Sequence, residues 1–442
     1  MNPCPLDTWT RQRLHLSGRP LTRADLTRYH NKALQELVRH CSAHSAFYRR
    51  TWAGLNLGNI QGIADLHRLP CTSETELRQQ GQAMLCVSQD AVARIMTLAS
   101  SGSTGAAKRL FFTADDLEHT RDFFHHGMLH LLQPGERVAI FLPGDSPDST
   151  GALLAEALNR VPAPCRIFGM VEDLMQGARQ LASWQASVLV GLPVQMLALV
   201  RMARHLGCVP ASLRSALLCS DYVAHSICTA LSGQFGCAVF SHYGSVESGL
   251  GAAVDCSAHN GLHVRESDIF FEIVDECLRP LPPGEWGEIV LTTLSRRGMP
   301  LVRYRSGDWG RLLPGVCSCG STLVRLDQVR GRMAGFVSLT KGGQLSLATL
   351  DEALFSLPGL LDFQAGLWRG SSDEELLQVR LSTLPGHEQS TLEQARTILA
   401  STLSHLCGLP VQLHCSSNPE IMHVGKRQLH NYRENSGNEN TY

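Results

Sequence analysis

Short apolar runs alternate with longer amphipathic stretches through the middle of this chain, and that alternation constrains the fold most. The runs occupy residues 137–142, 187–190, 216–220 and 238–241, and segments with helical spacing separate them. Strands that alternate with helices are typical of a layered domain in which helices cover a largely parallel sheet. We therefore predict an α/β fold.

The parts of the chain on either side of this alternation follow different patterns. The first hundred residues are expected to be mostly helical, because Leu26, Leu34, Leu37 and Val38 recur at the spacing of one helix face. Further along, residues 271–274 and 288–292 flank a turn that is rich in proline and glycine, so they are expected to pair as antiparallel strands.

These patterns predict two domains. Residues 1–331 are expected to form a large, multi-layer domain with mixed and parallel sheets. Residues 332–442 are expected to form a small, mobile α+β domain that carries Lys426 and ends in a disordered polar tail. We find no internal repeat or low-complexity tract in the sequence.

Composition and charge exclude several classes of protein. Of the 442 residues, 43% are hydrophobic and 18% are charged, and the formal net charge is -1, so neither a nucleic-acid binder nor a polyanion is expected. No apolar run is long enough to span a membrane, and the start of the chain lacks the order of a signal peptide, so a cytoplasmic protein is expected. The 15 cysteines are then expected to be free thiols, with a subset available to a metal.

A loop rich in serine and glycine follows an apolar run that ends at Leu98. Glycines let the backbone turn its N–H groups toward an anion, hydroxyls add donors, and a lysine adds positive charge. This composition suits a phosphate group, although a flexible surface loop is the alternative. It is not a GxxxxGK phosphate loop, because the lysine does not directly follow a glycine. The residues concerned are Ser100, Ser101, Gly102, Ser103, Thr104, Gly105 and Lys108.

Later segments carry further candidates for a nucleotide site. Tyr243 and Glu247 follow a strand-like run, and they offer a flat ring for a base and a hard oxygen ligand for Mg²⁺. Asp308 follows a glycine and could accept hydrogen bonds from vicinal ribose hydroxyls. Arg332 and Lys426 each follow a glycine and could reach phosphate groups. The alternatives are an ordinary loop for Glu247 and a solvated surface lysine for Lys426.

The order of these motifs resembles that of a known family. A Ser/Gly loop, Tyr-Gly-x-x-Glu, Tyr-Arg-x-Gly-Asp, Gly-Arg and a C-terminal Gly-Lys succeed one another as in the adenylate-forming acyl-CoA synthetase superfamily. The chain is most similar to the phenylacetate–CoA ligase group, and the resemblance covers nearly the whole sequence. Further matching segments are 40–49, 261–264, 282–288 and 300–305.

The resemblance implies a two-step reaction. A carboxylic acid, with an aryl or arylacetic acid implied by the resemblance, attacks the α-phosphate of ATP to give an acyl adenylate and pyrophosphate; coenzyme A then displaces AMP. The implied nucleotide-site residues are Ser100–Gly105 and Lys108 around the phosphates, Ser220, Asp221, Tyr243 and Gly244 around adenine, Asp308 and Arg332 at the ribose, Glu247 at Mg²⁺, and Lys426 at the carboxylate. A homodimer is common among similar enzymes.

Four residues form a separate candidate metal site. Cys256 and His263 precede the expected antiparallel strands, and Cys317 and Cys319 follow them, so a sheet could bring the two pairs together around a closed, structural Zn²⁺. Some members of the ligase group have matching elements. The alternative is a set of core thiols with a hydrogen-bonded histidine, and His259 is a substitute for His263.

The small domain departs from the family pattern. An acidic pair that usually follows the Gly-Arg motif and serves as a hinge is replaced by residues 333–335, Met-Ala-Gly. The loop that approaches the thiol in the family is also atypical at residues 341–345. Two alternatives therefore stay beside transfer to coenzyme A: adenylation with transfer to another thiol, such as that of a carrier protein, and a nucleotide-binding sensor or partner subunit that has lost turnover.

Overall fold

The computed structural model describes residues 4–16, 18–98, 107–332, 335–369, 374–404, 406, 409–416, 419–422 and 427–433. The chain divides into two compact units, each assembled from several segments. The first unit contains residues 1–133, 146–162 and 241–329, and the second contains 134–145, 163–240 and 330–442. The domain division at residues 331 and 332 stays a prediction.

Helices form the beginning of the first unit, as the hydrophobic spacing predicts. Helix α2 (Arg23–His44) buries Leu26, Leu34, Leu37 and Val38 along one face. Thr22 and Asp25 form a capping box at its start, which satisfies backbone N–H groups that the first turn leaves unpaired. The other helices of this unit are α1 (Pro5–Arg13), α3 (Ala46–Thr51), α4 (Glu74–Gln80), α5 (Ala114–Met128) and α6 (Thr150–Leu158).

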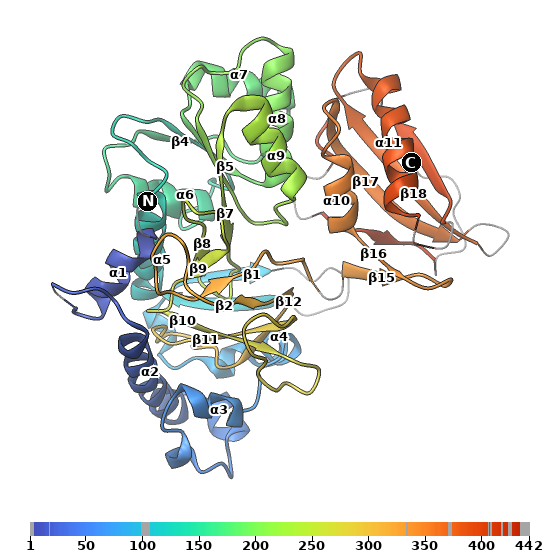
Figure 1. The fold of residues 1–442 in the computed structure, drawn as a ribbon. Helices are drawn as coiled ribbons and strands as arrows, with labels where there is room; N and C mark the ends of the chain where they lie inside the picture. The colour runs from blue at the N-terminus through green and yellow to red at the C-terminus, as the bar shows by residue number, and fades with distance from the viewer. Residues whose placement is uncertain are drawn as a thin grey trace. The chain divides into compact units, whose positions relative to one another are not determined.

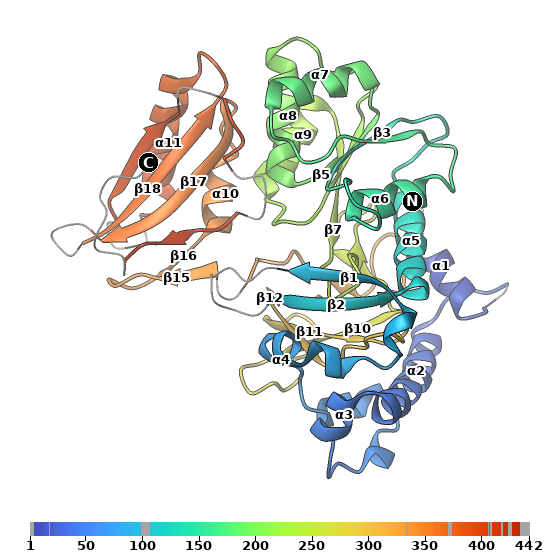
Figure 2. The same cartoon turned by 180° about the vertical axis from the view of Figure 1, so that it is seen from behind.

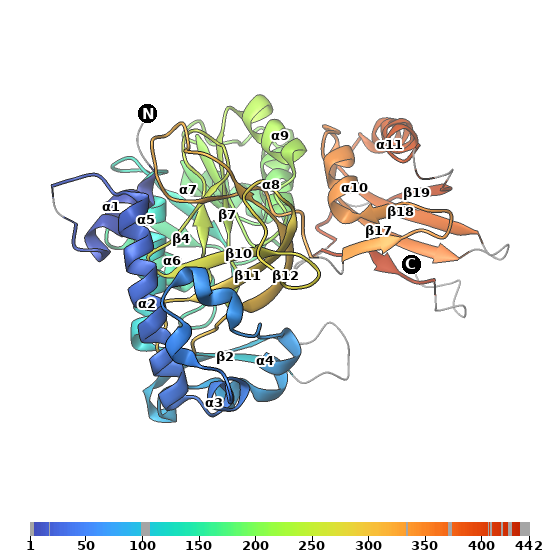
Figure 3. The same ribbon diagram turned by 60° about the horizontal axis from the view of Figure 1, so that its bottom comes forward.

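The strands of the first unit pair antiparallel. Phe271 lies opposite Leu291, and Val274 lies opposite Glu288, so the predicted pairing on either side of the Pro/Gly turn is confirmed. The hairpin of β1 (Val92–Leu98) and β2 (Lys108–Thr113) is visible in Figure 2, and β10 (Ile269–Val274), β11 (Gly287–Thr293) and β12 (Tyr304–Gly310) lie side by side in Figure 3. A further antiparallel group follows the end of β7 (Ala238–Tyr243) through β8 (Ala253–Val254), β9 (Leu262–Val264), β14 (Arg325–Leu326) and β13 (Leu312–Leu313).

The second unit contains the predicted parallel sheet. Its strands are ordered β4 (Cys165–Ile167), β3 (Val138–Phe141), β5 (Val188–Gly191) and β6 (Ser215–Leu218), and all three pairings are parallel. Every residue of β3 and β5 is buried, as expected for strands covered on both faces. Helices α7 (Leu174–Trp184), α8 (Pro193–His205) and α9 (His225–Phe235) accompany these strands, as Figure 1 shows.

The C-terminal part of the second unit is α+β, as predicted. It begins with a hairpin and continues with a four-stranded sheet ordered β19, β18, β17 and β20. Strands β17 and β18 pair antiparallel, whereas the two outer pairings are parallel. The elements are β15 (Phe336–Ser338), β16 (Gln344–Ser346), α10 (Leu347–Leu354), β17 (Leu360–Arg369), β18 (Glu375–Thr383), α11 (Glu388–Thr402), β19 (Val411–Cys415) and β20 (His430–Asn431).

Helix α8 lies at the centre of the second unit. Every residue from Pro193 to Ala203 is buried, including Arg201. The Arg201 guanidinium donates hydrogen bonds to the carbonyl oxygens of Leu360 at 2.5 Å and Phe355 at 3.0 Å, and so ties α8 to the connection between α10 and β17. A helix that is buried on all sides belongs in the core of its unit. Among the described residues, no helix combines the length and the apolarity that crossing a bilayer requires.

Candidate functional site

The strands on either side of the Ser/Gly loop form a hairpin. Leu98 at the end of β1 lies opposite Lys108 at the start of β2. The loop therefore leaves one strand of the hairpin and returns to the other. Ser100, Ser101, Gly102, Ser103, Thr104 and Gly105 lie outside the described residues, so their expected phosphate contacts stay a prediction.

Lys108 and Glu247 form a buried ion pair in the first unit. Only 3% of Lys108 is exposed, and its Nζ atom donates to Glu247 Oε1 and, at 3.1 Å, to Glu74 Oε1. The Tyr304 hydroxyl donates to the same Glu247 oxygen at 3.1 Å. Sequence analysis did not identify Glu74 or Tyr304 as partners, because only the tertiary fold brings α4 and β12 to this point.

The surroundings of Glu247 keep its side chain ionised. Burial disfavours the charged form, but the charge of Lys108 and its hydrogen bond outweigh that effect, so the pKa of Glu247 lies below its usual value. A buried carboxylate is a hard oxygen ligand, and Mg²⁺ in nucleotide sites commonly uses one or two carboxylates together with phosphate oxygens. The donor therefore fits the ion that the sequence predicts there.

Tyr243 and Asp308, which were expected to contact adenine and ribose, are brought together in the first unit. The Tyr243 hydroxyl donates to Asp308 Oδ2 at 2.8 Å. Burial and the neighbouring Asp308 charge raise the pKa of Tyr243, so its hydroxyl stays a neutral donor. The ring also meets Phe271 edge-on, with the ring centroids 6.0 Å apart.

Glycine is required at position 244 by close backbone packing. A Cβ atom at Gly244 would lie 2.7 Å from Gly251 Cα and 2.7 Å from the Leu250 carbonyl oxygen. The loop that carries Tyr243 and Glu247 therefore folds back on itself, and any larger residue at 244 would force its two arms apart.

Other predicted site residues belong to the second unit. Ser220 follows β6 with a positive φ of 72°, and Asp221 accepts a hydrogen bond from the Tyr222 backbone N–H at 2.8 Å. Arg332 is exposed, and its carbonyl oxygen accepts from the Gly335 N–H at 2.8 Å. The departure at 333–334 lies outside the described residues.

Lys426 also lies outside the described residues, but its neighbour is firmly held. Arg427 is buried in the second unit, with Nη1 2.6 Å from Asp351 and Nε 3.4 Å from Asp362. Its guanidinium also lies over the ring of Phe363 at 4.5 Å. The chain is therefore anchored one residue after the lysine that is expected to meet the carboxylate.

The arginine of the Val-Arg-Tyr segment has a structural role. Arg303 has a positive φ of 46° and is buried. Its guanidinium donates to Glu272 at 3.0 Å and to three backbone carbonyl oxygens, those of His67, Leu69 and Leu278. Arg303 therefore fixes the entrance to β12, the strand on which Asp308 lies.

The four predicted metal ligands converge in the first unit. The ligand atoms of Cys256, His263, Cys317 and Cys319 all lie within 4.8 Å of one another, and all four residues are buried. Cys256 Sγ lies 3.8 Å from Cys317 Sγ, and Cys319 Sγ lies 3.4 Å from His263 Nε2. Zn–S bonds of about 2.3 Å in a tetrahedron place two sulfurs about 3.8 Å apart, so the set fits Zn²⁺. The alternative ligand His259 instead pairs with Asp255 at 2.8 Å.

Comparison with known proteins gives the context for this geometry. No family model matches the chain. The phenylacetate–coenzyme A ligase of Thermus thermophilus is 29% identical over 378 residues, which cover 82% of this chain and 83% of that protein. The phenylacetate–coenzyme A ligase of Escherichia coli is 27% identical over 320 residues, which cover 70% of this chain and 71% of that protein. These relationships support an adenylate-forming acyl-CoA ligase, close to the phenylacetate–CoA ligases.

A solved ligase structure shares the fold. A 2-hydroxyisobutyryl-CoA ligase in its postadenylation state superposes with a TM-score of 0.80 and 20% identity, covering 94% of this chain and 91% of that one. At this identity the likeness shows the acyl-CoA ligase fold alone. It confirms the expected fold class, an α/β fold with a large N-terminal domain of mixed and parallel sheets and a small α+β C-terminal domain.

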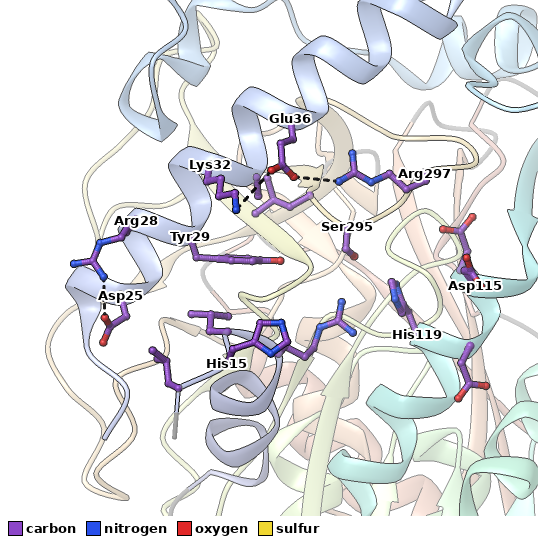
Figure 4. Close-up of a pocket in the computed structure, with 17 residues that line it drawn as sticks. His15, Asp25, Arg28, Tyr29, Lys32, Glu36, Asp115, His119, Ser295 and Arg297 are labelled. Carbon is purple, nitrogen blue, oxygen red and sulfur yellow. Dashed lines mark hydrogen bonds and ion pairs between the residues drawn. The ribbon is translucent and has the colours of Figure 1, made fainter. Parts of the chain in front are cut away.

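A cleft elsewhere on the first unit of this chain is lined by none of the residues predicted for the nucleotide or metal sites. It has a volume of about 650 Å³ and lies between α1, α2, α5 and the segment around Ser295 (Figure 4). Its charges are largely paired within the wall: Arg297 lies 3.5 Å from Glu36, and Arg28 lies 3.4 Å from Asp25. A wall that satisfies its own charges gives no preference for an anion or a cation, so we assign it no ligand.

Proposed function

We propose that this chain activates a carboxylic acid with ATP, releases pyrophosphate, and transfers the acyl group to coenzyme A with release of AMP. One observation carries the proposal: Tyr243 and Asp308, expected at the two halves of one nucleoside, are joined by a 2.8 Å hydrogen bond. The relationship to two phenylacetate–coenzyme A ligases supports the same reaction. An aryl or arylacetic acid is the substrate class that this relationship favours.

Each residue has a role in the proposed reaction. Lys108 holds Glu247 in place, and Glu247 would bind Mg²⁺, which screens phosphate charge when it is bound. Tyr243 flanks adenine, and Asp308 accepts the ribose hydroxyls. The remaining contacts are Ser100–Gly105 to the phosphates, Ser220, Asp221 and Gly244 to adenine, Arg332 to the ribose, and Lys426 to the reacting carboxylate.

Two further features are part of the proposal. Cys256, His263, Cys317 and Cys319 would hold a structural Zn²⁺, because three thiolates and one imidazole at tetrahedral spacing leave no open position for catalysis. The chain would also work as a homodimer, which sedimentation of the purified protein measures. A protein that stays monomeric at the assay concentration would contradict the proposed homodimer.

A panel of carboxylic acids tests the proposed reaction. We expect pyrophosphate release that depends on ATP, Mg²⁺ and one class of acid, and a product whose mass equals that of the acyl-CoA thioester when coenzyme A is added. Lys426→Ala should lower pyrophosphate release by about 100-fold or more while ATP still binds, because charge on the reacting carboxylate is no longer stabilised. Lys32→Ala, at a lysine that is 79% exposed and lies outside the predicted site, is the matched control.

The outcomes separate the competing functions. Nucleotide binding without pyrophosphate release from any acid would point to a sensor and contradict the proposed reaction. If acyl adenylate accumulates in the presence of coenzyme A and is consumed when a carrier-protein thiol is added, the acceptor is the carrier protein and not coenzyme A. Pyrophosphate release at the wild-type rate in Lys426→Ala would remove that lysine from the mechanism.

A further inference from the structure

Two buried arginines in the first unit carry nitrogen atoms that have no hydrogen-bond partner among the described residues. Arg265 and Arg296 are 5% and 6% exposed. Arg265 Nε and Nη1 and Arg296 Nη1 are buried and have no hydrogen-bond partner in the part of the chain that the structure describes. A guanidinium carries five N–H donors, and leaving them unpaired away from water is unfavourable. Neither residue was singled out by sequence analysis.

An aromatic ring covers each of these guanidinium groups. Arg265 lies over the Phe123 ring at 4.9 Å, and Arg296 lies over the Phe112 ring at 4.8 Å. The only described carboxylate in ion-pair range of Arg265 is Asp268 at 3.6 Å, which Arg13 already engages at 2.9 Å. Stacking of this kind fixes the plane of a guanidinium while its N–H edge stays available to another group.

Both guanidinium groups converge on Gly249. A Cβ atom at that glycine would lie 3.1 Å from Arg296 Nη2 and 3.8 Å from Arg265 Nη2, and its φ of +75° itself favours glycine. Two positive groups therefore approach one point on the backbone. Like charges that meet in a desolvated place are stabilised by an anion between them.

The convergence point belongs to the loop of the proposed nucleotide site. That loop carries Tyr243 and Glu247 at one end and Gly249 and Gly251 at the other. A Cβ atom at Gly251 would lie 2.8 Å from His242 Nε2, a buried nitrogen that also has no partner among the described residues. The loop that carries the proposed nucleotide-site residues therefore also packs against buried donors without partners among the described residues.

We propose that Arg265 and Arg296 bind a second carboxylate of the acid substrate, so that the enzyme selects dicarboxylic acids. The inference rests on the proposed function and names its substrate class. One carboxylate of the acid would react at the nucleotide end of the loop, and the other would accept hydrogen bonds from the two guanidinium groups near Gly249. Planar guanidinium forks match a carboxylate in this way. The rings of Phe123 and His242, whose centroids lie 5.9 Å apart, adjoin the same loop at Gly251.

Pairs of acids that differ only in the second carboxylate test the inference. We expect kcat/KM for pyrophosphate release to be at least tenfold higher for 1,4-phenylenediacetate than for 4-methylphenylacetate, and higher for glutarate than for pentanoate. Arg296→Met should lower kcat/KM for the diacid by about 100-fold, mainly through KM, and should lower that for the monoacid far less. Arg296→Lys, which keeps the charge but loses the fork, should fall between.

Control variants distinguish a loss of diacid binding from a loss of folding and from a failure of the proposed reaction. Arg297→Met, at the neighbouring half-exposed arginine, should change neither kcat/KM value. If Arg296→Met does not fold, as judged by its thermal unfolding, Arg265→Lys and Arg296→Lys provide the comparison. Monoacids preferred in both pairs, or equal losses for both acids, would overturn the inference while pyrophosphate release still upholds the proposed reaction. If no acid is turned over, a rise in unfolding temperature with the diacid that Arg296→Lys reduces supports the inference, and no rise in the wild-type protein overturns it.

Discussion

At the scale of single residues, the central feature is the carboxylate of Glu247. It is buried beside Lys108 and Tyr304, and Lys108 is shared with the more exposed Glu74. A motif of Tyr-Gly-x-x-Glu indicates that a glutamate follows a turn, but it does not indicate which cation compensates the glutamate. Lys108 lies 139 positions earlier in the chain, at the start of the hairpin strand β2.

Replacing Glu247 tests its proposed role at Mg²⁺. Glu247→Gln keeps the shape of the side chain but removes the charge, so we expect about a 100-fold lower rate of pyrophosphate release and a higher Mg²⁺ requirement. A titration of activity against Mg²⁺ measures both. Glu74→Gln removes the other partner of Lys108 and should leave the Mg²⁺ requirement unchanged; an identical titration for Glu247→Gln and wild type would place the metal elsewhere.

At the scale of elements, short strands bring the cysteine–histidine cluster together. His263 lies on β9, which pairs with β14 through His263 and Arg325, and Cys317 and Cys319 lie between β13 and β14. Strands of two or three residues contribute few ladder hydrogen bonds and little buried surface. A metal that ties these connections together would therefore contribute much of their stability.

Metal analysis tests the cluster. We expect one zinc per chain in wild type, and we expect Cys317→Ser to lose it and to lower the free energy of unfolding by about 3 kcal/mol or more. Cys277→Ser, at an exposed cysteine outside the cluster, should keep both the zinc and the stability. Wild-type protein without zinc, or equal zinc content in Cys317→Ser, would contradict the assignment.

At the scale of the whole molecule, burial sets the response to acid. Burial lowers the pKa values of His30 and His119, and burial together with the charge of Arg265 lowers that of His242 to about 4. Below pH 6.5 the unfolded chain therefore binds protons that the folded chain does not. The free energy of unfolding therefore decreases as the pH falls from 6.5 toward 4.

A pH series of thermal unfolding checks this response. We expect the unfolding temperature to fall steadily between pH 6.5 and 4.5, with about 1.4 kcal/mol per pH unit for each proton taken up. His30→Gln should make the decline shallower, whereas His205→Gln, at an exposed position, should not change it. An unfolding temperature that is constant over this range would contradict the expected proton uptake.

The sequence by itself determined the elements and the order of the motifs. Helix α2, the parallel strands and the β10–β11 pair follow from local periodicity, because hydrophobic spacing reports which face of each element is buried. The convergence of Cys256, His263, Cys317 and Cys319 was also predicted, because the two pairs lie on either side of the expected antiparallel strands.

Only the tertiary structure decided which charges meet. The Lys108–Glu247 pair, the Tyr243–Asp308 hydrogen bond and the approach of Arg265 and Arg296 to Gly249 each bring together residues that lie far apart in the sequence. Local periodicity contains no signal for such contacts, because a charged side chain has the same pattern in the sequence whether it is solvated or buried against a partner. The second carboxylate that we propose for the acid is therefore inferred from the packing around Gly249. The motifs indicate only that an acid is activated.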